Sequence, residues 1–181
     1  MRKLVVILVS LFLAVSALAA GPFTLSGGVG QVFVSSSGNL FASTVDMEAN
    51  LWLSGEFAFS DHFAAAATYT RDTAKVEAWL VKHNFVERTV EKYAYNRFDL
   101  AAEYIWNPSD KAVLYLKAGP SLFWLGDASA LGLHAALGMR AKLTEHLGAI
   151  TEIGYFHVQD FLPEPRVANA GEVRVGLSWR F

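Results

Sequence analysis

Apolar and polar residues alternate along most of this chain with a period of two. In residues 44–60, for example, Leu51 and Leu53 alternate with Trp52 and Ser54. Such alternation is typical of a β-strand with one face in an apolar medium, and a helical spacing of 3.6 residues fits the chain less well. We therefore predict an all-β fold with eight strands, at residues 23–34, 44–60, 63–71, 95–106, 112–124, 130–143, 147–158 and 170–181.

The connections between these segments alternate in length. The short connections are rich in turn-forming residues and fall at 60–62, 107–110 and 144–146. The longer ones fall at 35–43, 72–94 and 159–169, with 126–129 as a shorter exception. Short turns at one end and long loops at the other, joined by an even number of strands, are typical of transmembrane β-barrels. The predicted fold is thus an eight-stranded antiparallel up-and-down transmembrane β-barrel.

A soluble barrel of the lipocalin type also alternates, but its apolar face points inward. Two features favour the membrane. The polar face mixes charges of both signs with many small residues, which suits the narrow interior of a small barrel. Aromatic residues also gather at the strand ends next to the short turns, as an interfacial girdle would. This predicted periplasmic girdle comprises Phe57, Phe59, Phe63, Tyr104, Trp106, Trp179 and Phe181.

The first residues predict export. Arg2 and Lys3 precede a short apolar run, and Ala17-Leu18-Ala19 matches a signal-peptidase site. We expect a cleavable signal peptide at residues 1–19 and a barrel domain at residues 20–181. Cleavage would leave 13 of the 15 basic side chains against 17 acidic ones, which argues against nucleic-acid binding. The chain has no cysteine, so disulfides and thiol chemistry are excluded.

The signal peptide, the eight alternating segments and the final residues "GLSWRF" together resemble the small outer-membrane β-barrel proteins, the OmpA/OmpX/OmpW-like group. The resemblance covers the whole mature chain and implies a location in a bacterial outer membrane, with both termini in the periplasm. In that group an aromatic C-terminal residue, preceded by apolar residues at alternate positions, resembles the signal for the outer-membrane assembly machinery. Phe181, Trp179, Leu177 and Val175 match that pattern.

Alternation also predicts which charged residues face the barrel lumen. The expected lumen charge network comprises Glu48, Glu56, Arg97, Asp99, Glu103, Lys117, Arg140, Lys142, Glu152, Glu172 and Arg174. Buried charges need partners, since an unpaired buried ion costs several kcal/mol. We expect Glu56 or Glu103 to pair with Lys117, Arg140 or Arg174. Such a network can be a structural plug or the lining of a narrow polar pore, and the sequence leaves both open.

The longest connection, residues 72–94, has two interpretations. Val76, Trp79, Leu80 and His83 have the spacing of a short amphipathic helix. Alternation over residues 86–93 instead favours a hairpin that prolongs the neighbouring strands and whose edges could bind a surface ligand. A separate membrane hairpin, giving ten strands, is disfavoured because charges fall on both of its faces.

The sequence offers little support for catalysis. No histidine has the His-x-Ser pattern of lipid-deacylating barrels, and the weak pair His157 and Asp160 is the least unfavourable candidate. Metal-ligand spacing and nucleotide-binding fingerprints are absent, so no metal or cofactor is predicted. We expect a non-enzymatic envelope protein that acts through its loops. A narrow channel for small or hydrophobic solutes and a lipid-modifying enzyme are the alternatives, and the oligomeric state is undetermined.

Overall fold

The computed structural model describes residues 23–37, 44–82, 85–125, 128–159 and 167–181. The expected signal peptide at 1–19 lies outside these residues, as do parts of the long loops. The strands are β1 (Phe23–Ser37), β2 (Thr44–Met47), β3 (Asn50–Ala58), β4 (Phe63–Lys82), β5 (Phe85–Ser109), β6 (Ala112–Leu125), β7 (Ala128–Lys142), β8 (Leu147–Gln159) and β9 (Val167–Arg180).

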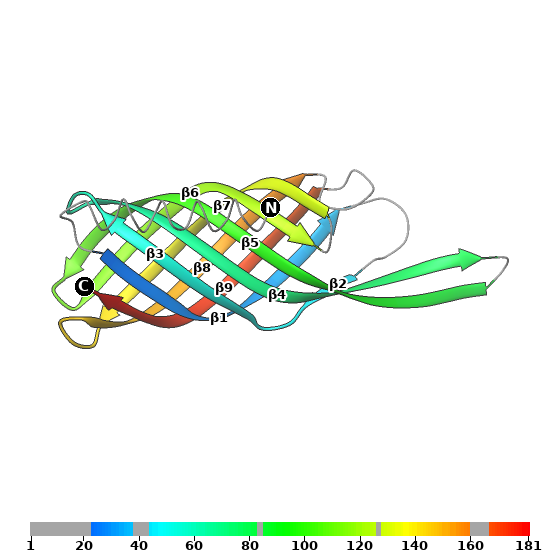
Figure 1. Cartoon of the computed structure of the whole chain (residues 1–181), viewed down its shortest axis with the longest axis horizontal. Helices are drawn as coiled ribbons and strands as arrows, with labels where there is room; N and C mark the ends of the chain where they lie inside the picture. The colour runs from blue at the N-terminus through cyan, green and yellow to red at the C-terminus, as the bar shows by residue number, and fades with distance from the viewer. Residues whose placement is uncertain (1–22, 38–43, 83–84, 126–127, 160–166) are drawn as a thin grey trace.

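These strands form one closed antiparallel barrel (Figure 1). Each strand of the wall pairs with its neighbours in sequence, β1 pairs with β9, and β4 pairs with β5 to complete the ring. Since β2 and β3 are successive parts of one strand, the nine strands make eight crossings. The predicted eight-stranded up-and-down barrel is confirmed. The described residues contain no helix of the length and apolarity needed to cross a membrane.

The break between β2 and β3 is a β-bulge that the sequence pattern did not reveal. Met47 pairs with Ala74, and Leu51 pairs with Arg71, so four steps on one strand face three steps on the other. One extra residue shifts the alternation of sides along the strand. Glu48 lies at this break and is exposed, with its carboxylate 3.8 Å from Lys92 Nζ. The predicted continuous alternation through 44–60 therefore does not extend across Glu48.

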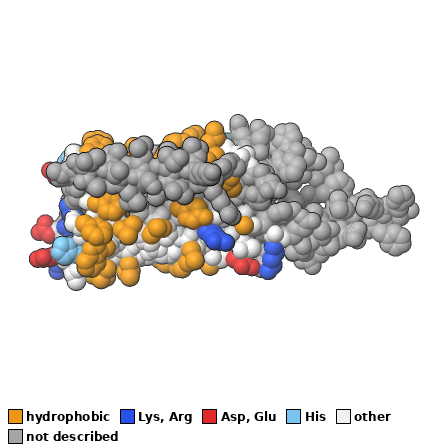
Figure 2. Space-filling view, in the orientation of Figure 1, with side chains coloured by type: hydrophobic (Ala, Val, Ile, Leu, Met, Phe, Trp, Pro, Cys, Tyr) orange, Lys and Arg blue, Asp and Glu red, His pale blue; other side chains and the backbone are white. Residues whose placement is uncertain are grey.

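The wall has an apolar outer face and a mixed inner face. Strand β3 shows the alternation directly, with Trp52 and Ser54 buried while Leu51 and Leu53 are exposed. On the face drawn in Figure 2, hydrophobic side chains are spread over the described part of the barrel body, and charged side chains lie toward its ends. A closed barrel satisfies its backbone hydrogen bonds between strands, and an apolar wall presents hydrocarbon to lipid. The choice of a membrane barrel over a lipocalin-type barrel follows from this arrangement.

Residues 72–94 belong to one long β-hairpin. The β4–β5 ladder runs without a register shift from Phe63–Tyr104 to Lys82–Phe85. Among the described residues, strand β6 joins β5 only from Tyr95 onward, and the outer part of the hairpin projects beyond the barrel wall (Figure 1). The hairpin interpretation is confirmed and the helical one is wrong. Because the hairpin prolongs two existing strands, it adds no membrane crossing.

The barrel closes at a tightly packed pair of glycines. Gly28 on β1 is the register partner of Gly176 on β9. A Cβ atom on Gly176 would lie 2.3 Å from the backbone oxygen of Gly27 and 2.6 Å from the Trp52 ring. The indole Nε1 of Trp52 also donates a hydrogen bond of 3.2 Å to the carbonyl of Val29. Only glycine fits this close approach of two backbones and a lumenal indole.

Candidate functional site

The barrel lumen holds a buried network of charged side chains that centres on Arg97 and Arg174. Arg97 contacts Asp99 at 3.1 Å and Glu172 at 2.5 Å. Arg174 lies 2.9 Å from Glu172, 3.2 Å from Glu152 and 3.7 Å from Asp99. Glu152 on β8 and Arg174 on β9 are register partners on adjacent strands, and β5, across the barrel from β9, supplies Arg97 and Asp99. Two guanidinium groups thereby neutralise carboxylates from opposite parts of the wall.

Glu152 links this centre to the turn end of the lumen. Its carboxylate lies 2.6 Å from Lys117 Nζ and accepts a hydrogen bond of 3.1 Å from the Tyr115 hydroxyl. The second carboxylate oxygen contacts Arg174. Glu152 therefore has cationic partners on both sides, which is the arrangement that offsets the cost of burying a carboxylate.

Neutral polar side chains complete the network. Asn50 donates to Glu172 at 3.2 Å, Ser121 donates to Asp99 at 2.5 Å, and Arg174 donates to Thr70 Oγ1 at 2.7 Å. The sequence analysis did not single out these residues. Strand alternation does place each of the three uncharged residues, Asn50, Thr70 and Ser121, on the lumenal side. Uncharged residues at such positions are common, however, and do not by themselves indicate a contact.

A second, separate ion pair lies nearer the short turns. Arg140 donates to Glu56 through both terminal guanidinium nitrogens, Nη1 and Nη2, and Arg140 is only slightly exposed. Glu103 is buried beside them, and its Oε1 has no hydrogen-bond partner in the described part of the chain. The space among Glu103, Lys117 and their neighbours is about 10 Å³, roughly the size of one water molecule.

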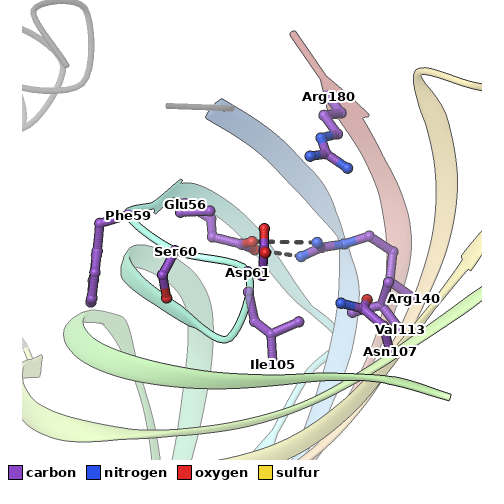
Figure 3. A pocket seen from close by; sticks show the side chains of 10 residues that line it. Glu56, Phe59, Ser60, Asp61, Ile105, Asn107, Val113, Arg140 and Arg180 are labelled. Atoms are coloured by element: carbon purple, nitrogen blue, oxygen red, sulfur yellow. Dashed lines mark hydrogen bonds and ion pairs between the residues drawn. The ribbon is translucent and has the colours of Figure 1, made fainter. Parts of the chain in front are cut away.

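This pair forms the floor of a cavity at the turn end (Figure 3). The cavity has a volume of about 270 Å³ and opens among Phe59, Asp61, Asn107 and Arg180. In Figure 3 the Arg180 guanidinium points toward the space above Glu56 and Arg140, and Asp61 lines the same cavity. The lumen is thus accessible from this end as far as the floor of the cavity.

Apolar layers lie on both sides of the charges. Tyr95, Phe123 and Phe156 are buried toward the hairpin end, with the rings of Phe123 and Phe156 5.3 Å apart. The Arg97 guanidinium carbon lies 4.7 Å from the centre of the Phe156 ring. Ile105 and Val113 pack near the short turns. Apolar side chains therefore flank the Arg97–Arg174 network on both sides, while buried Asp72 lies level with Tyr95 and the turn-end cavity reaches Glu56 and Arg140; the sequence analysis did not anticipate this order.

The structure brings together most of the residues assigned to the lumen. Nine of them lie in the interior: Glu56, Arg97, Asp99, Glu103, Lys117, Arg140, Glu152, Glu172 and Arg174. Glu48 and Lys142 do not join them. Glu48 is exposed at the bulge, and Lys142 is exposed at the last residue of β7, where the strand has already left the barrel interior.

The residues assigned to the aromatic girdle lie together at the turn end. The rings of Phe59 and Phe63 are 6.4 Å apart, and Phe63 contacts Tyr104 edge-on at 5.4 Å. Trp179 stacks on His146 at 5.6 Å. Six of the seven, namely Phe59, Phe63, Tyr104, Trp106, Trp179 and Phe181, are exposed on the wall, whereas Phe57 is half-buried.

The described residues contain no group of three His, Asp or Glu side chains placed to hold a metal ion. His157 Nδ1 lies 2.8 Å from Asn169 Oδ1, and its suggested partner Asp160 lies outside the described residues. His134 is buried in the lumen, and neither ring nitrogen has a hydrogen-bond partner in the described part of the chain.

A closed eight-stranded barrel with an apolar wall and a charged interior defines an integral outer-membrane protein. The chain matches the model of the "Outer membrane protein beta-barrel domain" family over residues 5–181 and belongs to that family. It is thus a bacterial outer-membrane protein, as expected from its resemblance to the small outer-membrane barrels. A comparison with curated protein sequences gave no significant match.

Solved structures of small outer-membrane barrels share the fold. The outer membrane protein OprG from Pseudomonas aeruginosa is 16% identical, with 90% of this chain and 96% of that chain covered and a TM-score of 0.68. Neisserial surface protein A is 16% identical, with 89% and 99% covered and a TM-score of 0.66. Ail, the attachment invasion locus protein of Yersinia pestis, is 12% identical, with 90% and 100% covered and a TM-score of 0.54. At these identities the likeness establishes the fold alone.

Proposed function

We propose that this protein is a non-enzymatic, non-conducting barrel that anchors its long hairpin at the cell surface, where the hairpin contacts molecules outside the cell. In outer-membrane barrels the short turns face the periplasm and the long loops face outward. We infer the same orientation here, which places the turn-end aromatic girdle at the periplasmic interface and the β4–β5 hairpin outside.

The layered lumen supports a plug. Arg97 and Arg174 bridge carboxylates on β5, β8 and β9, while Lys117 extends the network to β6. An ion that crossed this region would have to separate desolvated ion pairs, which costs several kcal/mol for each buried ion left unpaired. Bulky aromatic side chains close the layer above. A steady aqueous path through these layers is therefore disfavoured.

The hairpin supports the surface role. Residues 78–82 of β4 and 85–89 of β5 pair only with each other among the described strands, so within the described part of the chain both outer edges of the ribbon have unpaired backbone groups. Such edges can accept an extended segment of a partner by β-augmentation. One fold relative, Ail, is named as an attachment invasion locus protein, which is consistent with surface contact by a barrel of this kind.

The C-terminal strand supports recognition by the assembly machinery. Strand β9 pairs with both β1 and β8, so it must be present for the barrel to close. Phe181 is exposed next to Phe23, with ring centres 5.9 Å apart. We propose that Phe181 and Trp179 form the assembly signal. Replacing Phe181 with Ser should lower the amount of folded protein in the outer membrane while spontaneous refolding in detergent is retained.

One observation favours a second candidate, the passage of hydrophobic molecules into the barrel wall. Strands β1 and β3 pair only as far as Gly30 and Asn50, and no ladder joins the outer parts of β1 and β2 among the described residues. We call this interruption of the described ladders the seam. Val32, a buried residue of β1, lies beside it at the hairpin end of the lumen. A small apolar molecule could pass sideways between lumen and lipid there without crossing the charges.

Recordings from planar bilayers test the plug. Refolded protein should show no steady single-channel steps, and reproducible ion-selective steps would contradict the proposal. A vesicle assay with a fluorescent apolar probe tests the second candidate. If the seam admits such molecules, the protein should speed probe transfer, and Val32→Trp should slow it again. Transfer equal to that in protein-free vesicles would exclude the second candidate and leave the first standing.

A further inference from the structure

The cavity at the turn end has the features of a ligand site that the plugged lumen does not require. Its walls are apolar at Ile105 and Val113, and its floor is the closed ion pair of Glu56 and Arg140. Its volume of about 270 Å³ exceeds the space of one water molecule many times over. Small-molecule sites typically combine such apolar walls with a few convergent polar groups.

Two charges of opposite sign at the mouth are available to a ligand. Asp61 and Arg180 both line the cavity and both are exposed. Neither makes an ion pair within the described part of the chain. Asp61 comes from the β3–β4 turn and Arg180 from the end of β9, so they reach the mouth from different elements of the barrel (Figure 3).

The position of Arg180 is held by the backbone around it. Its amide donates a hydrogen bond of 2.8 Å to the His146 carbonyl, and its own carbonyl lies 2.9 Å from His146 Nδ1. Arg180 also borders a second hollow, which is lined by Asp110, Lys142 and Glu145. A ligand in the first cavity could therefore extend across Arg180 into a neighbouring hollow that also carries both signs of charge.

We propose that this turn-end cavity binds a short peptide that carries a free carboxylate and a free amine. The carboxylate would pair with Arg180, whose guanidinium can hold it in a bidentate manner. The amine would face Asp61, and a small aliphatic side chain would contact Ile105 and Val113. The charges that line the cavity sum to zero, and Glu56 and Arg140 already pair with each other, so a zwitterion leaves no charge unpaired whereas a simple anion or cation would.

This inference goes beyond the proposed surface role and does not depend on it. The surface role concerns the hairpin end, and the peptide site lies at the opposite end of the barrel. If the turn end faces the periplasm, the source of the ligand is the peptide pool or the peptide portion of the cell wall, and the chemistry is the same for either.

The test uses full-length mature protein refolded in zwitterionic detergent micelles and the dipeptide alanyl-alanine as the probe. Binding is followed by nuclear magnetic resonance shifts of backbone amides, with three probe forms compared: the free dipeptide, its C-terminal amide and its N-acetyl derivative. Because both protein charges are exposed, each lost pairing should weaken binding by about two- to five-fold. Shifts should concentrate at the β3–β4 turn and at the ends of β5 and β9.

Variants that remove one charge at a time test each proposed pairing separately. Arg180→Gln should weaken binding of the free dipeptide and abolish the preference for acid over amide, while the preference for free amine over N-acetyl persists. Asp61→Asn should do the reverse. Arg71→Gln, an exposed cation on β4 far from the turns, is the matched control and should change neither preference.

Several outcomes would overturn the proposal. One is the absence of saturable shifts for any probe form in the wild-type protein. Another is binding that Arg180→Gln and Arg71→Gln weaken equally, since that would reflect net charge alone. Shifts confined to the hairpin end would also contradict it. Whether the protein conducts or contacts surface partners affects none of these readouts.

Discussion

The sharpest prediction concerns Arg174, the group that joins the two halves of the lumen network. Replacing Arg174 with Met keeps the length of the side chain and removes its charge. Glu172, Glu152 and Asp99 would then lose contacts of 2.9, 3.2 and 3.7 Å. Among the described residues, they would retain only Arg97 and Lys117 as cationic partners.

The size of the effect follows from burial. Arg174 is 1% exposed. Removing one member of a buried ion pair costs about 3–5 kcal/mol, because the partner remains as an uncompensated buried charge. With a urea m-value of about 2 kcal/mol/M, the unfolding midpoint should fall by roughly 2 M. Tryptophan fluorescence during urea titration in lipid vesicles, with matched refolding curves, measures the midpoint.

Arg180→Met is the control for this experiment. Arg180 lies on the same strand at a position of the same parity, but it is exposed and makes no ion pair with the described residues. Its replacement should change stability by less than about 0.5 kcal/mol. Adding Glu172→Gln to Arg174→Met should recover part of the loss, since it removes one of the surplus carboxylates. Equal midpoints for the Arg174 and Arg180 variants would refute the buried-network argument.

Further predictions concern the closure, the network and the hairpin. Gly176→Val should prevent barrel closure and abolish heat-modifiable gel migration, because its Cβ would lie 2.3 Å from a backbone oxygen of β1; Gly171→Val, with nothing within 4 Å of an added Cβ, should migrate like the wild type. Ser121→Ala removes the donor to buried Asp99 and should cost about 1.5–3 kcal/mol in the same urea assay, and a change below 0.5 kcal/mol would be inconsistent with the contact. Replacing residues 78–89 with a two-residue Asn-Gly turn should leave the compact gel form intact, because the barrel ladders end before that segment; loss of the compact form would show that the hairpin is needed for folding.

The lumen illustrates how far sequence reasoning extended. Parity placed nine charged residues on the inner face, where the structure has them, because strand alternation is a local property of the backbone. It also suggested Glu56 with Arg140 among several pairings, and the structure joins these two. Glu48 and Lys142 are exceptions for local reasons. A bulge interrupts the alternation at Glu48, and strand β7 ends at Lys142.

The hairpin shows a different limit. Residues 76–83 fit helical spacing and residues 86–93 fit strand spacing, so short-range pattern supported both structures. Strand pairing decides in favour of the hairpin, since each residue of β4 from Phe63 to Lys82 has a partner on β5. Ladder hydrogen bonds formed from an already paired base extend a strand more readily than a new helix could nucleate.

By itself, the sequence determined that this chain is an eight-stranded membrane barrel and which side of most strands faces lipid, because a period of two and a few turn residues encode those properties locally. Only the tertiary structure decided that Arg174 unites Glu152, Glu172 and Asp99, that apolar side chains flank this network, and that Asp61 and Arg180 border one cavity. These relations depend on the register between strands distant in sequence and on ring closure. A one-residue shift in the pairing of two strands would turn the lumenal side chains of one strand toward lipid and replace their partners.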